Sequence, residues 1–384
     1  MQTLESCPSC KTRKRVLVSR YNRLVLVPDM RDTEEARYDY SLCCGCGLFY
    51  AARRPAGGEF EALLSRFNEI LGRPEKLDQN ILIHSGPLND AIRAEIDREA
   101  RPWWELREAA ETDQGRVVRP MLADMQSEIS DLAFIQPFAR IKDARVLHIR
   151  SKTGCLADML RRVLGAGQVD VITLFPVNQY LIEKLYGLRA GACLDFERFE
   201  IPFDAKYSLI IANHMLTHAI DPQQFLRHAR SKLRTGGHLY MRHEPSDRRM
   251  WGQRENLIGE LRPFHFQQFD EAVLRRVVTA AGFRVVSAGF KYPNSKKSEM
   301  VLLAEKIGEL DEVEPAGASE IAERQSMYGD WYDESVVALG ELIGDGLPEA
   351  ELNAAADRVV RRGAAVRGER VTLQEPMKIL HMAH

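Results

Sequence analysis

The stretch from Arg145 to Pro245 constrains the fold more than any other part of the chain. Short apolar runs alternate in it with amphipathic segments, which is typical of βαβ units around a parallel sheet. Four of these runs predict strands: Val146–Ile149, Val169–Leu174, Leu209–Ala212 and His238–Met241. In such a sheet the ligand lies beyond the carboxyl ends of the strands. We therefore predict an α/β fold with the functional site in this stretch.

A helix is predicted between the last two of these strands. Asp221 can cap its N-terminus, and Pro222 fits the first helical position, where a missing N–H costs nothing. Apolar residues at a spacing of four then give the helix one buried face. Gly236-Gly237 predicts a left-handed C-terminal cap, because glycine adopts that conformation most easily.

The order of these motifs resembles that in the central part of class I S-adenosylmethionine-dependent methyltransferases. The family text is roughly FDLI…HVLEH…DP…LKPGG. The matching residues here are Tyr207-Ser-Leu-Ile-Ile, His214-Met-Leu-Thr-His218, Asp221-Pro222 and Gly236-Gly237. The resemblance covers about Arg145 to Lys306. It implies a Rossmann-like α/β sheet, S-adenosylmethionine as cofactor and a methyl-acceptor substrate.

Composition places the chain among globular proteins of ordinary character. It has 384 residues, which is enough for two domains, with 45% hydrophobic and 28% charged residues. The formal net charge of −2 gives no electrostatic case for binding nucleic acid or an anionic membrane. We find neither an apolar N-terminal leader nor an apolar run of 18 residues, so we expect a cytoplasmic protein without membrane insertion.

The cysteines favour a metal site over disulfides. Five of the seven lie in the first 46 residues, and they include two C-x2-C pairs, Cys7/Cys10 and Cys43/Cys46. Four thiolates close a tetrahedral shell, so the pattern predicts a structural Zn²⁺ in a zinc ribbon. Cys44 is a competing ligand by position, but the spacing favours Cys43. The alternative is that these are reduced core cysteines.

The second cysteine pair carries a further resemblance. The run Tyr40-Ser-Leu-Cys43-Cys-Gly-Cys46-Gly-Leu-Phe-Tyr…Arg54-Pro55 is similar to the zinc-knuckle start of methyltransferases from polysaccharide, sugar and natural-product pathways. This resemblance implies a sugar or a related small molecule as substrate. Together with the helical pattern elsewhere it gives four regions: a zinc ribbon (1–57), a helical cap (58–142), the methyltransferase-like domain (143–307), and a linker with C-terminal helices (308–384).

The predicted cofactor loop departs from the family pattern. The family reads acidic-x-Gly-x-Gly-x-Gly after the first strand, and the matching positions here run from His148 to Gly154. Only Gly154 remains, because Arg150 and Lys152 replace two glycines and His148 replaces the acid. Long cationic side chains would fill space that the cofactor needs, and their charge would oppose its sulfonium.

The family's acid at the end of the second strand is missing as well. That strand ends Thr173-Leu-Phe-Pro176, and Asp170 lies at its other end. By the resemblance, Asp195 matches the acid that contacts the adenine ring. Asn213, after the third predicted strand, is the remaining candidate for cofactor binding.

Candidate catalytic residues follow two of the predicted strands. His218 matches the second histidine of the family's HVLEH, and His243 and Glu244 follow the fourth strand. A histidine or glutamate there can act as a general base for the methyl acceptor. The alternative for each is a hydrogen-bonded structural residue.

Two functions from different classes are considered, and the resemblance favours the first. The first is a zinc-ribbon methyltransferase that acts on a small molecule, such as a sugar, a nucleotide-sugar or a natural-product precursor. The second is a non-catalytic, methyltransferase-like scaffold or regulatory protein, in which Arg150 and Lys152 plug the cofactor site or bind an anion. Its protein partner would bind the zinc ribbon or the C-terminal helices. RNA modification is a third idea, against which the near-neutral charge counts.

Overall fold

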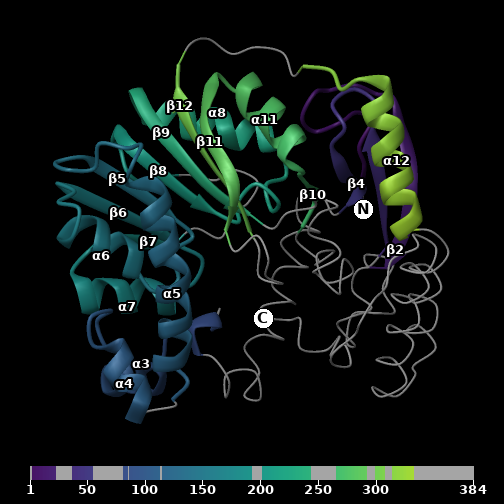
Figure 1. Cartoon of the computed structure of the whole chain (residues 1–384). Coiled ribbons are helices and arrows are strands. Elements are labelled where there is room, and N and C mark those ends of the chain that lie inside the picture. The colour runs from purple at the N-terminus through teal and green to yellow at the C-terminus, as the bar shows by residue number, and fades with distance from the viewer. Residues whose placement is uncertain are drawn as a thin grey trace, which may run out of the picture.

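The fold was analysed in a computed structural model. It describes residues 2–22, 37–54, 81–84, 86–112, 115–192, 201–243, 265–291, 299–307 and 314–332. The described strands form two sheets, and helices pack around the larger one (Figure 1).

The larger sheet has seven strands in the order β11-β12-β9-β8-β5-β6-β7. The strands β7, β6, β5, β8 and β9 are parallel, and β12 pairs antiparallel with both β9 and β11. Their bounds are β5 Arg145–Ile149, β6 Gln168–Thr173, β7 Arg189–Ala192, β8 Tyr207–Asn213, β9 Leu233–His243, β11 Phe283–Lys291 and β12 Glu299–Lys306. The predicted α/β fold and its four predicted strands are confirmed.

Four helices connect or flank these strands: α6 Cys155–Arg162, α7 Pro176–Tyr186, α8 Pro222–Lys232 and α11 Glu271–Ala280. The N-cap of α8 is as predicted, because an Asp221 carboxylate oxygen accepts the Gln224 N–H at 3.0 Å. Asp270 caps α11 in the same way, accepting the Val273 N–H at 2.9 Å. Both caps satisfy amides that the first helical turn leaves without a partner.

The predicted glycine cap at the end of α8 is wrong. The helix ends at Lys232, and Leu233 is already extended and pairs with Tyr207 of β8. The pairing of β8 with β9 then shifts register between Leu233 and His238, and Gly236, with φ +68°, lies within that irregular segment. The glycine pair therefore belongs to the strand, because sheet pairing takes the chain out of the helix earlier than the local signal indicates.

The smaller sheet contains the cysteine pairs and joins the α/β domain. Its strands are β1 Gln2–Thr3, β2 Arg15–Asn22, β3 Arg37–Cys43 and β4 Phe49–Arg54, in the order β1-β4-β3-β2. The short strand β10 Gln267–Gln268, from the C-terminal half of the chain, pairs with β4. Cys7, Cys46 and Tyr50 belong to the same apolar core as Phe225 of α8 and Leu274 of α11. This small unit, the ribbon, therefore packs as part of the main core.

The region before β5 is helical and covers one end of the sheet. It contains η4 Ile81–Ile83, α3 Asp90–Glu99, α4 Leu106–Thr112 and α5 Val118–Ile135. These elements share an apolar core with Cys155 and Val177, at the beginnings of α6 and α7. Those helices begin where β5 and β6 end, so the cap lies at the carboxyl edge of the sheet. Figure 1 shows α5 alongside the sheet and α3 and α4 beyond it.

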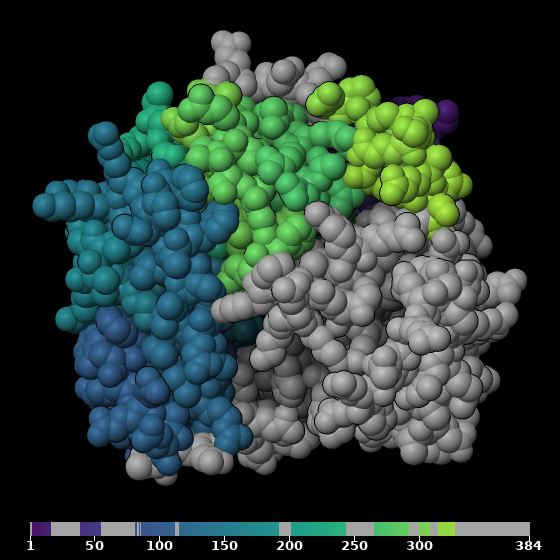
Figure 2. Space-filling model, viewed as in Figure 1, coloured from purple at the N-terminus to yellow at the C-terminus, as the bar shows by residue number. Residues whose placement is uncertain are grey.

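The last described helix, α12 Ala318–Tyr332, lies against β2 of the ribbon. Figure 2 shows it as a ridge on the surface beside the α11 and β11 region. The C-terminal helices that are predicted beyond Tyr332 lie outside the described residues. None of the helices in the described ranges combines the length and apolar character needed to span a membrane.

Candidate functional site

The sheet reverses its strand order between β5 and β8. These two strands are neighbours, but the connection from β5 leads toward β6 and that from β8 leads toward β9. At such a switch point the loops leave in opposite directions and open a crevice at the carboxyl ends. Arg150 follows β5 there and His214 follows β8. Both have left-handed backbones, with φ of +63° and +52°. Non-glycine residues rarely adopt this conformation, and it concentrates at functional sites.

The loop after β5 keeps a glycine-dependent conformation. Gly154 has φ +76°, and a Cβ there would lie 2.9 Å from Cγ1 of the buried Ile182. Only glycine fits such a position without strain. Arg150 is left-handed at a position where the resembling family has glycine. The backbone of the loop is therefore suited to glycines, while two of its side chains are long cations.

Arg150 bridges the crevice. Its Nη1 donates a hydrogen bond to the carbonyl oxygen of His214 at 2.5 Å, from the end of β5 to the end of β8. Its own amide donates to Ile172 of β6 at 2.8 Å, which fixes the base of the loop. Lys152, two residues further, is exposed. Arg150 is thus held at its backbone by β6 and at its guanidinium by the residue that follows β8.

The amides at the start of α6 also have partners within the chain. The Gly154 N–H donates to Ser151 Oγ at 3.0 Å, and the Leu156 N–H donates to Glu128 Oε2 at 2.8 Å. Helix N-termini attract anions because their N–H groups point outward and unpaired. Here the side chain of Glu128, from α5, takes the position that the carboxylate of a ligand would take. Asp124, also on α5, accepts a hydrogen bond from the hydroxyl of Thr153 at 2.7 Å.

His148 lies inside the domain and points away from solvent. It is fully buried, and its Nε2 lies 3.2 Å from the Asn213 amide nitrogen and 3.9 Å from Glu128 Oε1. Burial, with a smaller contribution from the charge of Arg242, lowers the pKa of His148 to about 3. Burial, reinforced by nearby Asp124, raises the pKa of Glu128 well above its usual value. His148 is therefore neutral, and the two predicted cofactor residues His148 and Asn213 contact each other.

The end of β6 has no carboxylate that could bind ribose hydroxyls. The hydroxyl of Thr173 donates to the carbonyl of Phe175 at 3.3 Å, and the loop continues into α7. Asp170 is fully buried near the other end of the strand. It accepts hydrogen bonds from Arg189 and from the hydroxyl of Tyr207, at 2.8 and 2.9 Å. Its role is to join strands at the amino edge.

A buried ionic network beside the crevice was missed in the sequence. Asp131, on α5, is fully buried and accepts from Tyr240, Arg242 and Lys291 at 2.6 to 2.7 Å. Such a carboxylate is tolerated because both of its oxygens accept hydrogen bonds and two of the three donors are cations. The available signal was the spacing of Asp124, Glu128 and Asp131, which places three acids on one face of α5.

His214 belongs to the same network. Its Nε2 lies 3.2 Å from Glu299 Oε1, at the beginning of β12. Burial alone would raise the pKa of Glu299, but His214 and the cations of Arg242 and Lys291 outweigh it and lower the pKa to about 2. Glu299 is therefore ionised at neutral pH and links three strand ends.

The predicted catalytic residues are placed only in part. His218 is buried, and its ring meets that of His265 edge-on at 4.6 Å between centroids. The backbone of His243 pairs with Met300, and its side chain is not described. Glu244 and Asp195 lie outside the described residues. The catalytic roles of His218, His243 and Glu244, and the adenine contact of Asp195, stay predictions.

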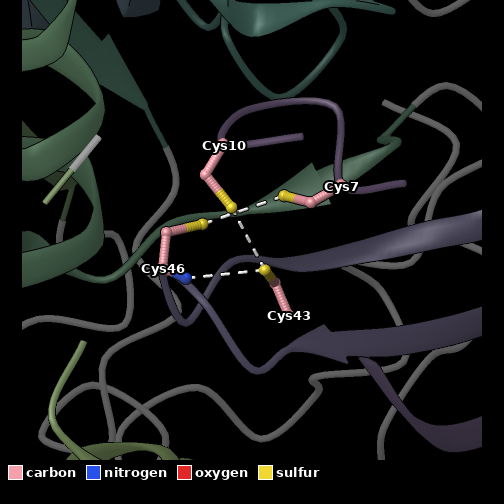
Figure 3. A group of neighbouring side chains, drawn as sticks. All are labelled: Cys7, Cys10, Cys43 and Cys46. Atoms are coloured by element: carbon pink, nitrogen blue, oxygen red, sulfur yellow. Dashed lines mark hydrogen bonds between the residues drawn. The ribbon is translucent and has the colours of Figure 1, made fainter. Parts of the chain in front are cut away.

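The four predicted metal ligands lie together. The sulfur atoms of Cys7, Cys10, Cys43 and Cys46 all lie within 4.8 Å of one another (Figure 3). The pair Cys7–Cys46 is 3.8 Å apart and the pair Cys10–Cys43 is 3.4 Å apart. Tetrahedral Zn²⁺ with Zn–S bonds of about 2.3 Å would place its sulfurs about 3.8 Å apart.

The donor set fits a structural metal ion. Four cysteines leave no open coordination position, and three of them are fully buried. Cys43 Sγ also accepts the amides of Gly45 and Cys46, at 3.2 and 3.5 Å, as in a turn that wraps a metal-bound thiolate. Cys44 is not part of the cluster, and its amide donates to Lys14. The spacing argument for Cys43 over Cys44 therefore agrees with the geometry.

The fold and the crevice define an open α/β domain with a switch-point site. Residues 121–288 match the family model described as a methyltransferase domain. The match runs from within α5 to within β11 and thus includes the crevice. The domain is a methyltransferase-like α/β domain, as the sequence resemblance predicts. No curated protein matches the chain.

Several solved structures are similar to parts of the chain. One is magnesium protoporphyrin IX methyltransferase from Synechocystis PCC 6803 with bound S-adenosylhomocysteine: 14% identity, 63% of this chain and 99% of that chain, TM-score 0.41. A second is an S-adenosylmethionine-dependent methyltransferase from Mesorhizobium loti: 11% identity, 45% and 95%, TM-score 0.38. A third is 1,6-didemethyltoxoflavin-N1-methyltransferase from Burkholderia thailandensis: 16% identity, 58% and 93%, TM-score 0.36.

The described residues at the switch point do not fit S-adenosylmethionine. The guanidinium of Arg150 bridges the two strand ends, and Glu128 occupies the amide of Leu156 at the start of α6. The cofactor's sulfonium would meet fixed positive charge, and its carboxylate would find that amide already taken. We therefore derive no chemical step through this cofactor.

Proposed function

We propose that this protein is a non-catalytic, methyltransferase-like scaffold or regulatory protein that does not bind S-adenosylmethionine. The observation that carries the proposal is the bond from Arg150 to the carbonyl of His214, which closes the crevice between β5 and β8. A charge-assisted hydrogen bond of this kind is about twice as strong as a neutral one. Cofactor entry would have to break it and move a cation that is held in a left-handed backbone.

The contacts of α5 support the same proposal. Asp124 and Glu128 hold the loop and the start of α6, and Asp131 holds the ends of β9 and β11. To open the cofactor site, α5 would have to give up these contacts together. Breaking a buried pair on one side costs about 3–5 kcal/mol, which is a large share of the stability of a typical domain.

Calorimetric titration with S-adenosylmethionine and S-adenosylhomocysteine tests the proposal. We expect no heat with the natural protein at millimolar ligand. We expect partial recovery in Arg150→Gly/Lys152→Gly, because glycine restores the loop and removes both cations. The matched control is Arg140→Gly/Lys142→Gly, which removes two exposed cations before the opposite end of β5. Micromolar binding to the natural protein would refute the proposal.

The second candidate is a methyltransferase that acts on a small molecule, such as a sugar, a nucleotide-sugar or a natural-product precursor. The domain match and the left-handed Gly154 favour it, since the loop keeps the backbone form of a cofactor loop. In this case His218, with its neighbour His265, is the first candidate for a general base. The calorimetric experiment separates the two candidates, and acceptor screening follows only if the cofactor binds.

For either candidate we propose that the cysteine cluster holds a structural Zn²⁺ and that the protein works in the cytoplasm. The reason is that four thiolates are available for one ion, and a reducing compartment keeps them free. A protein partner would bind at the ribbon or the C-terminal helices. Metal analysis of the purified protein should give one zinc per chain.

A further inference from the structure

We propose that α12 is a latch whose docking depends on the metal in the cysteine cluster. By latch we mean residues 314–332, the segment that leads into the helix and the helix itself. The inference rests on the proposed Zn²⁺ site but not on whether the cofactor binds, because it uses only contacts between the ribbon, α11 and α12. It assigns the cluster a regulatory task besides its structural one.

The second cysteine turn, from Cys43 to Gly47, is the platform to which the latch is attached. The amide of Ala316, just before α12, donates to the carbonyl of Gly45 at 2.6 Å. The side chain of Arg324 lies against Gly47, 3.3 Å from where a Cβ would be. The latch therefore touches the turn at two points, within two residues of metal ligands on either side.

The α/β domain holds the same turn from the other side. Arg276 of α11 donates to the carbonyl of Cys46 at 3.4 Å and to Glu320 of α12 at 2.7 Å. Arg324 donates twice to Asp270, at 2.6 and 2.8 Å, and is only 6% exposed. Since Asp270 also caps α11, one carboxylate joins the cap and the latch. The turn, α11 and α12 thus form one cluster of charged contacts.

Metal binding sets the shape of this platform. The Gly45 and Cys46 amides point at Cys43 Sγ. The Cys46 amide lies in one peptide plane with the Gly45 carbonyl, so the sulfur fixes the direction of the acceptor that Ala316 uses. The acceptor that Arg276 uses is the carbonyl of Cys46, which is itself a ligand residue. A Cβ at Gly45 would lie 2.6 Å from Thr12, so the two cysteine turns are closely packed. Without the ion only weak thiol contacts, such as Cys10–Cys43 at 3.4 Å, join the sulfurs, and both acceptors are held less firmly.

Release of the latch would expose a sheet edge. Within the described residues β2 is the outer strand of the ribbon sheet, and α12 lies against it (Figure 1). An uncovered edge strand is a template for pairing with another chain. Metal occupancy would in this way decide whether α12 covers β2.

Hydrogen exchange of the full chain, read by mass spectrometry, tests the latch. We expect chelation to raise the exchange rate of residues 318–326 at least ten-fold, with recovery when zinc is added back, while β5 continues to exchange more slowly than α12. Arg324→Gln should show the same loss of protection with zinc still bound at one ion per chain. The control is Arg284→Gln, which removes an arginine paired with Glu305 on the far strands and should leave α12 protected.

Linkage provides a second measurement. If the metal stabilises the docked helix, the docked helix must stabilise the metal by the same factor. We expect Arg324→Gln to weaken zinc binding about ten-fold in competition with a chelating dye, within the usual range of such couplings. The latch is refuted if the exchange of α12 does not change in Arg324→Gln. It is refuted equally if the variant binds zinc as tightly as the natural protein, or if β5 exchanges as fast as α12 after chelation.

Discussion

Replacement of Gly154 by alanine tests whether this glycine is kept for the fold. The residue has φ +76°, and a left-handed backbone costs an L-residue about 1–2 kcal/mol. The new methyl group would lie 2.9 Å from Ile182 and 3.1 Å from Tyr186, both buried. Overpacking of this kind costs about 1–3 kcal/mol. We therefore expect Gly154→Ala to lower the free energy of unfolding by about 2–5 kcal/mol.

Gly187 offers the matched control. It is also left-handed, with φ +60°, but nothing lies within 4 Å of the position of an added Cβ. Gly187→Ala therefore pays only the backbone cost, partly offset by about 0.4–1 kcal/mol from the less flexible unfolded chain. The two variants should differ by about 1–3 kcal/mol, which is the cost of the collision with the core.

Urea unfolding followed by circular dichroism measures this difference. With a slope near 3 kcal/mol per molar urea, the midpoints of the two variants should differ by about 0.3–1 M. Equal midpoints would refute the reasoning. They would mean that the core around Gly154 adapts to the added methyl group, and that the left-handed backbone at Gly154 serves ligand binding instead.

Two further predictions concern the cysteine cluster and the buried histidine. Cys43→Ser should abolish zinc binding and lower the free energy of unfolding of the ribbon and the α/β domain together by about 3 kcal/mol or more, because they share one core. Cys44→Ser should keep the metal. Thermal unfolding with metal analysis checks both variants, and two separate unfolding transitions would contradict the prediction. His148 is neutral in the folded protein, with a pKa of about 3. Its contribution to the free energy of unfolding is therefore complete above the unfolded pKa near 6.5 and is lost as the pH falls toward 3. Between pH 7 and pH 5 the loss of unfolding free energy amounts to about 2 kcal/mol. Urea unfolding of the natural protein should show this loss, and His148→Gln should not. An identical pH dependence in both proteins would argue against a buried neutral histidine.

Elements whose signals are local could be predicted from the sequence alone. The apolar runs located β5, β6, β8 and the second half of β9, because a buried strand needs continuous apolar side chains. Asp221 was readable as a helix cap because a cap needs one side chain at one position. The cysteine spacing likewise predicted four ligands, which the structure brings within 4.8 Å.

Features that depend on contacts between residues far apart along the chain could be seen only in the tertiary structure. Gly236-Gly237 locally predicts a helix cap, but the pairing of β9 with β8 places both glycines in an irregular part of the strand. The closing of the crevice depends on Glu128, which meets Leu156 across 28 residues, and on Arg150, which meets His214 across 64. Local propensity carries no information about such pairs, because their energy comes from desolvation and charge in a core that exists only after folding.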